Sequence, residues 1–276
     1  MIRLLVHIFL FVLTIGSTIV VGGVWYCISI MTILLAHEMG HFFVSRYYHI
    51  QSSFPFFIPF PNLFGTLGAI ILMRGRIASR KALFDIGATG PLVGFCLTIP
   101  AIVIGLELSE LVQVGQLSGV SFRLGNSLLF SFLERIIFGK VPEGTEIVLH
   151  PLAFAGWVGL FVTALNLMPI GQLDGGHIVY AVFGRRSRIC FYVAALGFGI
   201  LGVFFFPGWL LPLFLILLLG FRHPPPSDNE TELDGGRKLL AGGLFAVFIL
   251  SFIPIPLPDF EMNLITLIGK VLSRGF

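Results

Sequence analysis

The residues best suited to chemistry lie in one apolar stretch, residues 33–48, which reads ILLAHEMGHFFVSRYY. If this stretch is helical, His37 and His41 are four residues apart, so their imidazoles lie on one face about 6 Å apart. Two neutral imidazoles at this spacing can bind one zinc ion, and Glu38 can act as general base on a metal-bound water. The HExxH pattern is short, so a buried polar cluster without metal is the alternative interpretation.

A catalytic zinc ion also needs a third protein ligand and one open coordination position. The strongest candidate lies within residues 164–180, which read ALNLMPIGQLDGGHIVY. Pro169 disfavours helical geometry at Met168, and the glycines that follow permit a tight, unwound path. We therefore expect Asp174 to project from irregular backbone toward the HExxH segment.

The elements that carry these residues are expected to cross a membrane. Of the 276 residues, 56% are hydrophobic and 11% are charged, with a mean hydropathy of +0.98, whereas soluble domains average about 25% charged residues. At about 20 residues per transmembrane helix, the sequence predicts an all-α polytopic membrane protein with six to seven transmembrane helices. The expected spans are 4–23, 25–48, 84–106, 151–169, 189–206, 208–221 and 238–257. The formal charge of +3 gives no indication of nucleic-acid binding.

Lys and Arg residues set the expected orientation, because cytoplasmic loops carry an excess of both. Basic residues gather within 74–81, 185–188 and 222–238, and these segments fall on one side if the amino terminus is cytoplasmic. This topology puts the HExxH residues in the cytoplasmic half of their helix. The compact chain and the absence of a transit peptide make a prokaryotic plasma membrane the expected location.

Residues 53–73 are apolar but are interrupted by three prolines, which exclude a continuous helix. Their glycine-containing, β-prone end predicts a small membrane-associated β-hairpin, in which the backbone polar groups pair with one another. An exposed hairpin edge could bind an unwound substrate strand by β-addition, with Gly65, Gly68, Ile70 and Leu72 as candidate contacts. A purely structural hairpin is the alternative.

Taken together, the two motifs resemble those of the site-2 protease family of intramembrane zinc metalloproteases. That family pairs HExxH in one transmembrane helix with NxxPxxxLDG in a later one. In this chain Asn166, Pro169 and Asp174 stand at fixed positions of the second motif. Residues 65–95 also look like the family's segment leading into its third core helix.

The resemblance implies one catalytic zinc ion ligated by His37, His41 and Asp174, with Glu38 activating water. It also implies that Asn166 positions substrate or stabilises the oxyanion. The implied reaction is hydrolysis of peptide bonds within or beside the transmembrane segments of membrane-protein substrates. The rival function is a membrane divalent-metal transporter, which usually has ligands on several helices and often a His-rich loop. The seven histidines of this chain form no such cluster.

A single transmembrane metalloprotease domain over residues 1–276 is the expected organisation. It would contain the HExxH helix at 25–48 and the NxxPxxxLDG segment at 151–180. No PDZ or CBS domain is expected, because the 107–150 loop is too short for a PDZ domain and no long extension is present. The expected partners are transmembrane protein substrates and the lipid bilayer.

Overall fold

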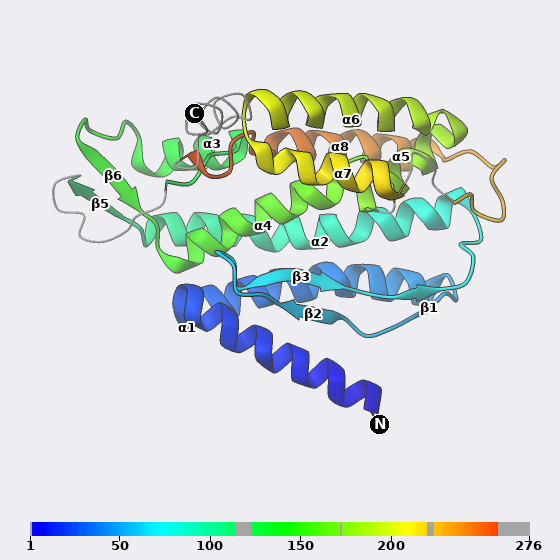
Figure 1. Ribbon diagram of the computed structural model, residues 1–276, viewed down its shortest axis with the longest axis horizontal. Helices are drawn as coiled ribbons and strands as arrows, with labels where there is room; N and C mark the ends of the chain where they lie inside the picture. The colour runs from blue at the N-terminus through cyan, green and yellow to red at the C-terminus, as the bar shows by residue number, and fades with distance from the viewer. Residues whose placement is uncertain (1, 114–122, 172, 220–223, 259–276) are drawn as a thin grey trace, which may run out of the picture.

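The computed structural model describes residues 2–113, 123–171, 173–219 and 224–258, and the account of the fold is confined to them. It is an elongated helical bundle in which long helices run roughly side by side (Figure 1). Three short two-stranded sheets accompany the helices. The largely helical fold with a small hairpin agrees with the class expected from sequence.

Helix α1, Ile2–Tyr47, is two helices joined at a sharp break. Gly23 adopts φ +75° there, a conformation that glycine reaches without steric cost. The two halves therefore diverge, and only the second packs along the bundle (Figure 1). This break lies between the spans expected at 4–23 and 25–48, and the second half carries the HExxH residues.

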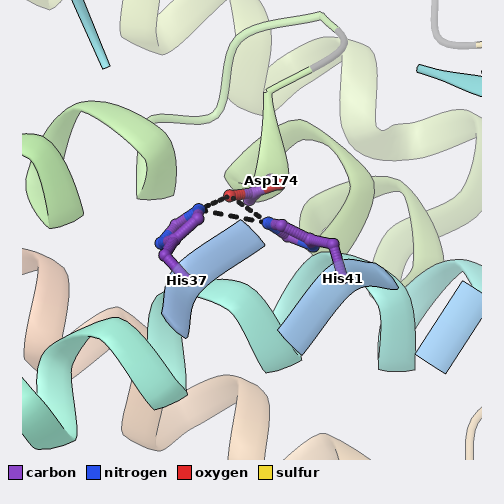
Figure 2. Close-up of side chains that lie close together, drawn as sticks. All are labelled: His37, His41 and Asp174. Atoms are coloured by element: carbon purple, nitrogen blue, oxygen red, sulfur yellow. Dashed lines mark hydrogen bonds and ion pairs between the residues drawn. The ribbon is translucent and has the colours of Figure 1, made fainter. Parts of the chain in front are cut away.

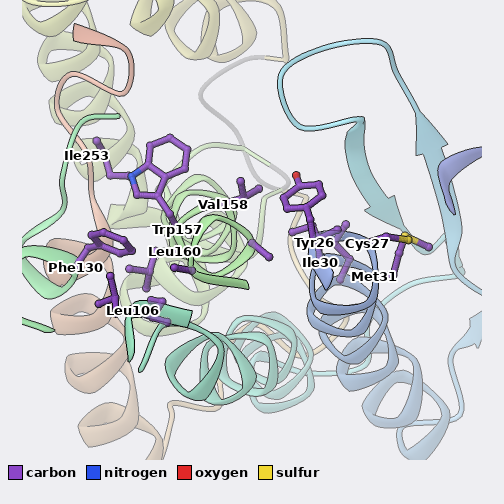
Figure 3. Packing of buried hydrophobic residues seen from close by; sticks show 14 of the residues in the cluster. Tyr26, Cys27, Ile30, Met31, Leu106, Phe130, Trp157, Val158, Leu160 and Ile253 are labelled. Carbon is purple, nitrogen blue, oxygen red and sulfur yellow. The ribbon is translucent and has the colours of Figure 1, made fainter. Parts of the chain in front are cut away.

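Helices α2 (Arg80–Glu107) and α4 (Pro151–Leu167) form the centre of the bundle with the second half of α1. They approach closely because glycines face backbone: a Cβ on Gly105 would lie 2.1 Å from the backbone nitrogen of Ala153. Small residues allow such approach in membrane helices. The apolar core between the three helices includes Tyr26, Trp157 and Leu160 (Figure 3).

The expected hairpin is present beside α1, as two short sheets placed end to end. Strand β2 (Phe56–Pro59) pairs antiparallel with β3 (Thr66–Ile70), and β1 (Gln51–Ser52) pairs with β4 (Met73–Arg74). A third sheet joins β5 (Glu110–Gln113) to β6 (Thr145–Val148), at one end of the bundle (Figure 1).

The remaining helices cover the face of α2 and α4 opposite the hairpin (Figure 1). Their bounds are α3 Leu128–Phe138, α5 Asp174–Phe183, η2 Gly184–Arg186, α6 Ser187–Phe204, η3 Pro207–Trp209, α7 Leu210–Leu219 and α8 Gly235–Ser251. Helices α6 and α7 meet at a short Pro-Gly turn, and α8 returns along α4.

Three helical segments of the described chain are long and apolar enough to cross a membrane. They are Leu5–Tyr47, Arg80–Glu107 and Asp174–Phe204, and α4 is a shorter apolar helix. Large apolar side chains such as Val20, Trp25 and Leu196 point outward and are 86%, 62% and 67% exposed. These features describe an integral membrane protein, while the larger number of six to seven spans stays a prediction.

Candidate metal centre

Three side chains converge between the second half of α1 and the beginning of α5 (Figure 2). His37 and His41 project from successive turns of α1, and Asp174 is the first residue of α5. His37 and His41 are buried, with exposed fractions of 4% and 5%. The two segments singled out in the sequence, more than a hundred residues apart, thus meet at one point.

The distances within this group match those around a tetrahedral zinc ion. Asp174 Oδ2 lies 3.3 Å from His37 Nε2 and 3.2 Å from His41 Nε2, and the two imidazole nitrogens are 3.1 Å apart. Zinc bonds of about 2.0–2.1 Å place tetrahedral ligand atoms about 3.3–3.4 Å from one another. The donor set therefore fits zinc and leaves a fourth position open.

Hydrogen bonds orient the ligand side chains. The Nδ1–H of His41 donates to the carbonyl oxygen of Ile86 at 2.7 Å, which fixes the tautomer that leaves Nε2 free for a metal. The amide nitrogen Nδ2 of Asn166 lies 3.2 Å from His37 Nε2. Asn166, near the end of α4, therefore lies at the edge of the metal centre.

Asp174 is held differently from the sequence expectation. The irregular backbone ends at Leu173, and Asp174 already has helical geometry as the first residue of α5. The positive end of the helix macrodipole favours a carboxylate at this position. Gly175 is also helical, and its lack of a side chain permits contact with α4, because a Cβ would lie 2.0 Å from the carbonyl oxygen of Leu167.

Glu38 lies beside the metal ligands and is only 6% exposed. Its carboxylate lies near enough to the backbone of Ile71, in the segment between β3 and β4, to interact with it. The hairpin therefore passes directly against the side chain expected to act as general base. The sequence pattern predicted the hairpin and the glutamate separately but not their contact.

Glycines on α2 form the wall behind the two imidazoles. A Cβ on Gly90 would lie 2.0 Å from His41 Nε2, and a Cβ on Gly94 would lie 3.2 Å from the Cβ of His37. The imidazoles thus occupy the space that side chains would fill. Sequence reasoning missed these residues, although the spacing of glycines in GATGPLVG was the available signal.

Arg80, at the beginning of α2, holds the far end of α5. Its Nε donates to the carbonyl oxygen of Ala181 and its guanidinium to that of Val182, both at 2.9 Å. The side chain is buried, at 9% exposure. A cation at a helix C-terminus stabilises the macrodipole, so Arg80 fixes the helix whose first residue is Asp174.

Asp85, in α2 near Arg80, connects Tyr48, just past the end of α1, to Arg237 in α8. It accepts from the Tyr48 hydroxyl at 2.5 Å and from Arg237 Nε and guanidinium at 2.8 and 2.6 Å. Desolvation and this hydrogen bond raise the pKa of Tyr48 to about 12. Arg237 also pairs with Asp234, which caps α8 by accepting from the Arg237 backbone. The LDGG sequence at residues 233–236 repeats the letters around Asp174, but here the aspartate is a helix cap.

The four hairpin candidates divide into two kinds. Gly68 in β3 is half-buried, whereas Ile70 at the end of β3 and Leu72 between β3 and β4 are exposed. Gly65 is buried against the first half of α1, where its carbonyl oxygen accepts from the Ser17 hydroxyl at 2.6 Å. Gly65 thus attaches the hairpin to α1, and the exposed edge begins beyond it.

A helical membrane protein with a buried His-His-Asp metal centre and an adjacent glutamate has the architecture of a membrane metallopeptidase. Residues 25–204 match the family model of peptidase family M50. The chain belongs to this family, and the resemblance to site-2 proteases drawn from its two motifs is confirmed.

Curated relatives carry names that agree with this assignment. The chain is 34% identical over 241 residues to the probable zinc metalloprotease EGY1, chloroplastic, of Arabidopsis thaliana, covering 82% of this chain and 42% of that protein. It is 30% identical over 234 residues to the probable zinc metalloprotease EGY2, chloroplastic, of the same plant, covering 82% and 40%. The chain thus spans about two-fifths of the length of these relatives.

Proposed function

We propose that the protein is a zinc metalloendopeptidase that hydrolyses peptide bonds within or beside the transmembrane segments of membrane-protein substrates. The observation that carries the proposal is the convergence of His37, His41 and Asp174 at zinc-ligand distances beside the buried Glu38. A buried acid next to two imidazoles is costly in a membrane helix and marks a functional site. Among the described residues, this is the one His, Cys, Asp and Glu group able to hold a metal ion.

The roles of the side chains follow from their positions. Zinc held by the His-His-Asp set supplies a Lewis acid that polarises a carbonyl and lowers the pKa of water. Glu38 accepts the proton of the attacking water and donates it to the departing amine. Asn166, whose amide lies beside His37, donates hydrogen bonds to the substrate or to the developing oxyanion.

A substrate helix must unwind before its peptide bonds can be attacked, and the hairpin has an edge to which the unwound strand could bind. The Ser53 backbone donates to the Leu72 carbonyl oxygen at 3.0 Å, and the Leu72 backbone donates to the Ser53 hydroxyl at 3.0 Å, so Leu72 faces its partner strand. Because strand residues alternate, Ala69 and Ile71 present their backbone groups to the opposite edge, on which Glu38 lies. We propose that substrate pairs along this edge between Gly68 and Leu72.

The edge can be tested with Ala69→Pro, which removes an outward N–H, against Ala69→Val, which keeps it. Ala69→Pro should slow cleavage of a single-span substrate at least ten-fold while zinc content stays at the wild-type level, because each lost β-addition bond weakens strand binding. Ala69→Val should cleave at close to the wild-type rate. Normal cleavage by Ala69→Pro would eliminate the edge as the substrate site.

The proposed enzyme activity is tested by reconstituting the protein with a tagged single-span substrate. Glu38→Gln removes the base and keeps the metal ligands, so we expect zinc to be retained and cleavage to be lost. His37→Ala should lose both. Normal cleavage by Glu38→Gln would refute the mechanism, and zinc flux through wild-type vesicles without cleavage would establish the transporter instead.

We also propose the membrane arrangement. The halves of α1, together with α2, α4, α6, α7 and α8, would supply six to seven spans within the described part of the chain. The membrane would be a prokaryotic plasma membrane. The amino terminus and the metal centre would face its cytoplasmic side, because this topology puts the basic segments at 74–81, 185–188 and 222–238 on that side. Labelling of single cysteines from each side of sealed vesicles tests this orientation.

A further inference from the structure

An apolar groove runs between helices α5, α6 and α8, on the side of the bundle away from the hairpin. Its volume is about 830 Å³, and all but one of its lining side chains are uncharged. The walls include Ile178 on α5, Val193 on α6, and Phe245 and Phe248 on α8. Figure 1 shows α6 and α8 running in roughly the same direction, with the short α5 at one end of them.

The floor of the groove reaches the backbone that carries the metal centre. Leu167, Pro169 and Gly175 line it, and these residues flank Asn166 and Asp174 in the chain. The end of α4 and the beginning of α5 therefore contribute residues both to the groove and to the metal centre.

One end of the groove is basic. Lys238, in the first turn of α8, is its charged lining residue. The turn that joins α5 to α6 lies at the same end (Figure 1) and carries the exposed Arg185, Arg186 and Arg188. Phe183 and Ile189, on either side of this turn, line the groove. Lys238 pairs at 2.9 Å with the exposed Glu232, and such surface pairs are weak enough for a phosphate to replace.

We propose that this groove binds one anionic glycerophospholipid, with an acyl chain between α5, α6 and α8 and the phosphate at Lys238 and the neighbouring arginines. An apolar slot fits an acyl chain, and basic pockets between transmembrane helices on the cytoplasmic side bind anionic headgroups. Bound there, the lipid packs against Gly175 and steadies the beginning of α5. The lipid site is independent of peptidase activity and can be measured on the Glu38→Gln enzyme.

Two neighbouring glycines of α8 provide a matched test of the acyl-chain site. A Cβ on Gly242 or on Gly243 would meet no atom within 4 Å, but only Gly242 lines the groove. Gly242→Phe should therefore place a bulky side chain in the groove with no clash at its Cβ, whereas Gly243→Phe adds the same bulk outside the lining of the groove. Both variants should retain zinc.

The measurement is native mass spectrometry of protein released from vesicles of equal phosphatidylglycerol and phosphatidylcholine. Wild-type protein and Gly243→Phe should retain one phosphatidylglycerol in preference to phosphatidylcholine, and Gly242→Phe should lose it. Equal retention of the two lipids by wild type, or unchanged retention by Gly242→Phe, would overturn the proposal. A co-purifying peptide in place of lipid would overturn it as well.

A second arm tests the headgroup contacts against the general excess of basic residues on the cytoplasmic side. Each of Lys238→Gln and Arg185→Gln should lower the preference for phosphatidylglycerol about five-fold, since one basic residue near anionic lipid contributes about that factor. Arg74→Gln and Arg76→Gln remove the same charge near the hairpin and should leave the preference unchanged. Equal losses in all four variants would reduce the effect to bulk surface charge and contradict a site.

Discussion

Gly90→Ala adds one methyl group to α2 behind the metal centre, and the structure gives its consequence in detail. The new Cβ would stand 2.0 Å from His41 Nε2, 2.4 Å from Cε1 and 2.5 Å from Cδ2. Favourable contacts between heavy atoms begin near 3.5 Å. The imidazole must therefore retreat by about 1.5 Å, or α2 must move away from α1.

Either movement removes His41 from the metal, because ligand distances tolerate only about 0.2 Å of error. Loss of an outer-shell partner costs about 10–100-fold in metal affinity, so displacing a ligand itself should cost more than about 100-fold. The effect on folding is smaller, because overpacking costs about 1–3 kcal/mol and the helix gains about 0.5–1 kcal/mol when alanine replaces glycine. The variant should fold and fail to hold zinc.

The assay is competition for zinc against a chelator, with cleavage and thermal unfolding measured on the same preparation. Gly94→Ala is the matched control, because its Cβ would stand 3.2 Å from the His37 side chain and needs only a small adjustment. We expect its zinc affinity to remain within about ten-fold of wild type. Wild-type zinc affinity in Gly90→Ala would refute the close packing of α2 against the imidazoles.

Three further predictions concern the supports of the site and the stability of the fold. Arg80→Met removes both hydrogen bonds to the end of α5 and should lower zinc affinity about ten-fold and also lower the melting temperature. Arg80→Lys should give intermediate values. Wild-type zinc affinity and melting temperature in Arg80→Met would contradict a positioning role. Burial raises the pKa of Glu134 in α3 to about 7, so the folded state holds this proton more tightly and stability should fall as pH rises from about 4.5 to 7. Glu134→Gln should abolish that fall, measured by thermal unfolding across the pH range. Chelation of zinc should lower the melting temperature, because zinc binds only the folded protein, and added zinc should restore it. Failure of added zinc to restore the melting temperature would contradict the zinc site.

The candidate ligand set could be proposed from the sequence because each part lies in a short local pattern. A four-residue spacing places His37 and His41 on one helix face whatever surrounds them. Asp174 could be predicted from the proline and glycines around it and from the family resemblance. Its helical position could not, since the same glycines suit either unwound backbone or close helix packing.

The remaining parts of the site depend on contacts between distant segments. Arg80 reaches carbonyl groups about a hundred residues later in the chain, and no local pattern marks that partner. The contact between Ile71 and Glu38 depends on the hairpin register, which one residue of slippage would reverse. The role of Gly90 becomes visible only when α2 is placed against α1.

The break in α1 at Gly23 has a consequence for how the chain can vary. In a continuous helix, each inserted residue turns everything after it by about 100°, which would rotate a metal ligand out of its site. Because α1 is broken at Gly23, a residue inserted in its first half need not rotate the second half, which carries His37 and His41. The family match begins at residue 25, just past this break. The first half-helix is thus joined at a point where changes in its length leave the angular position of the ligands intact.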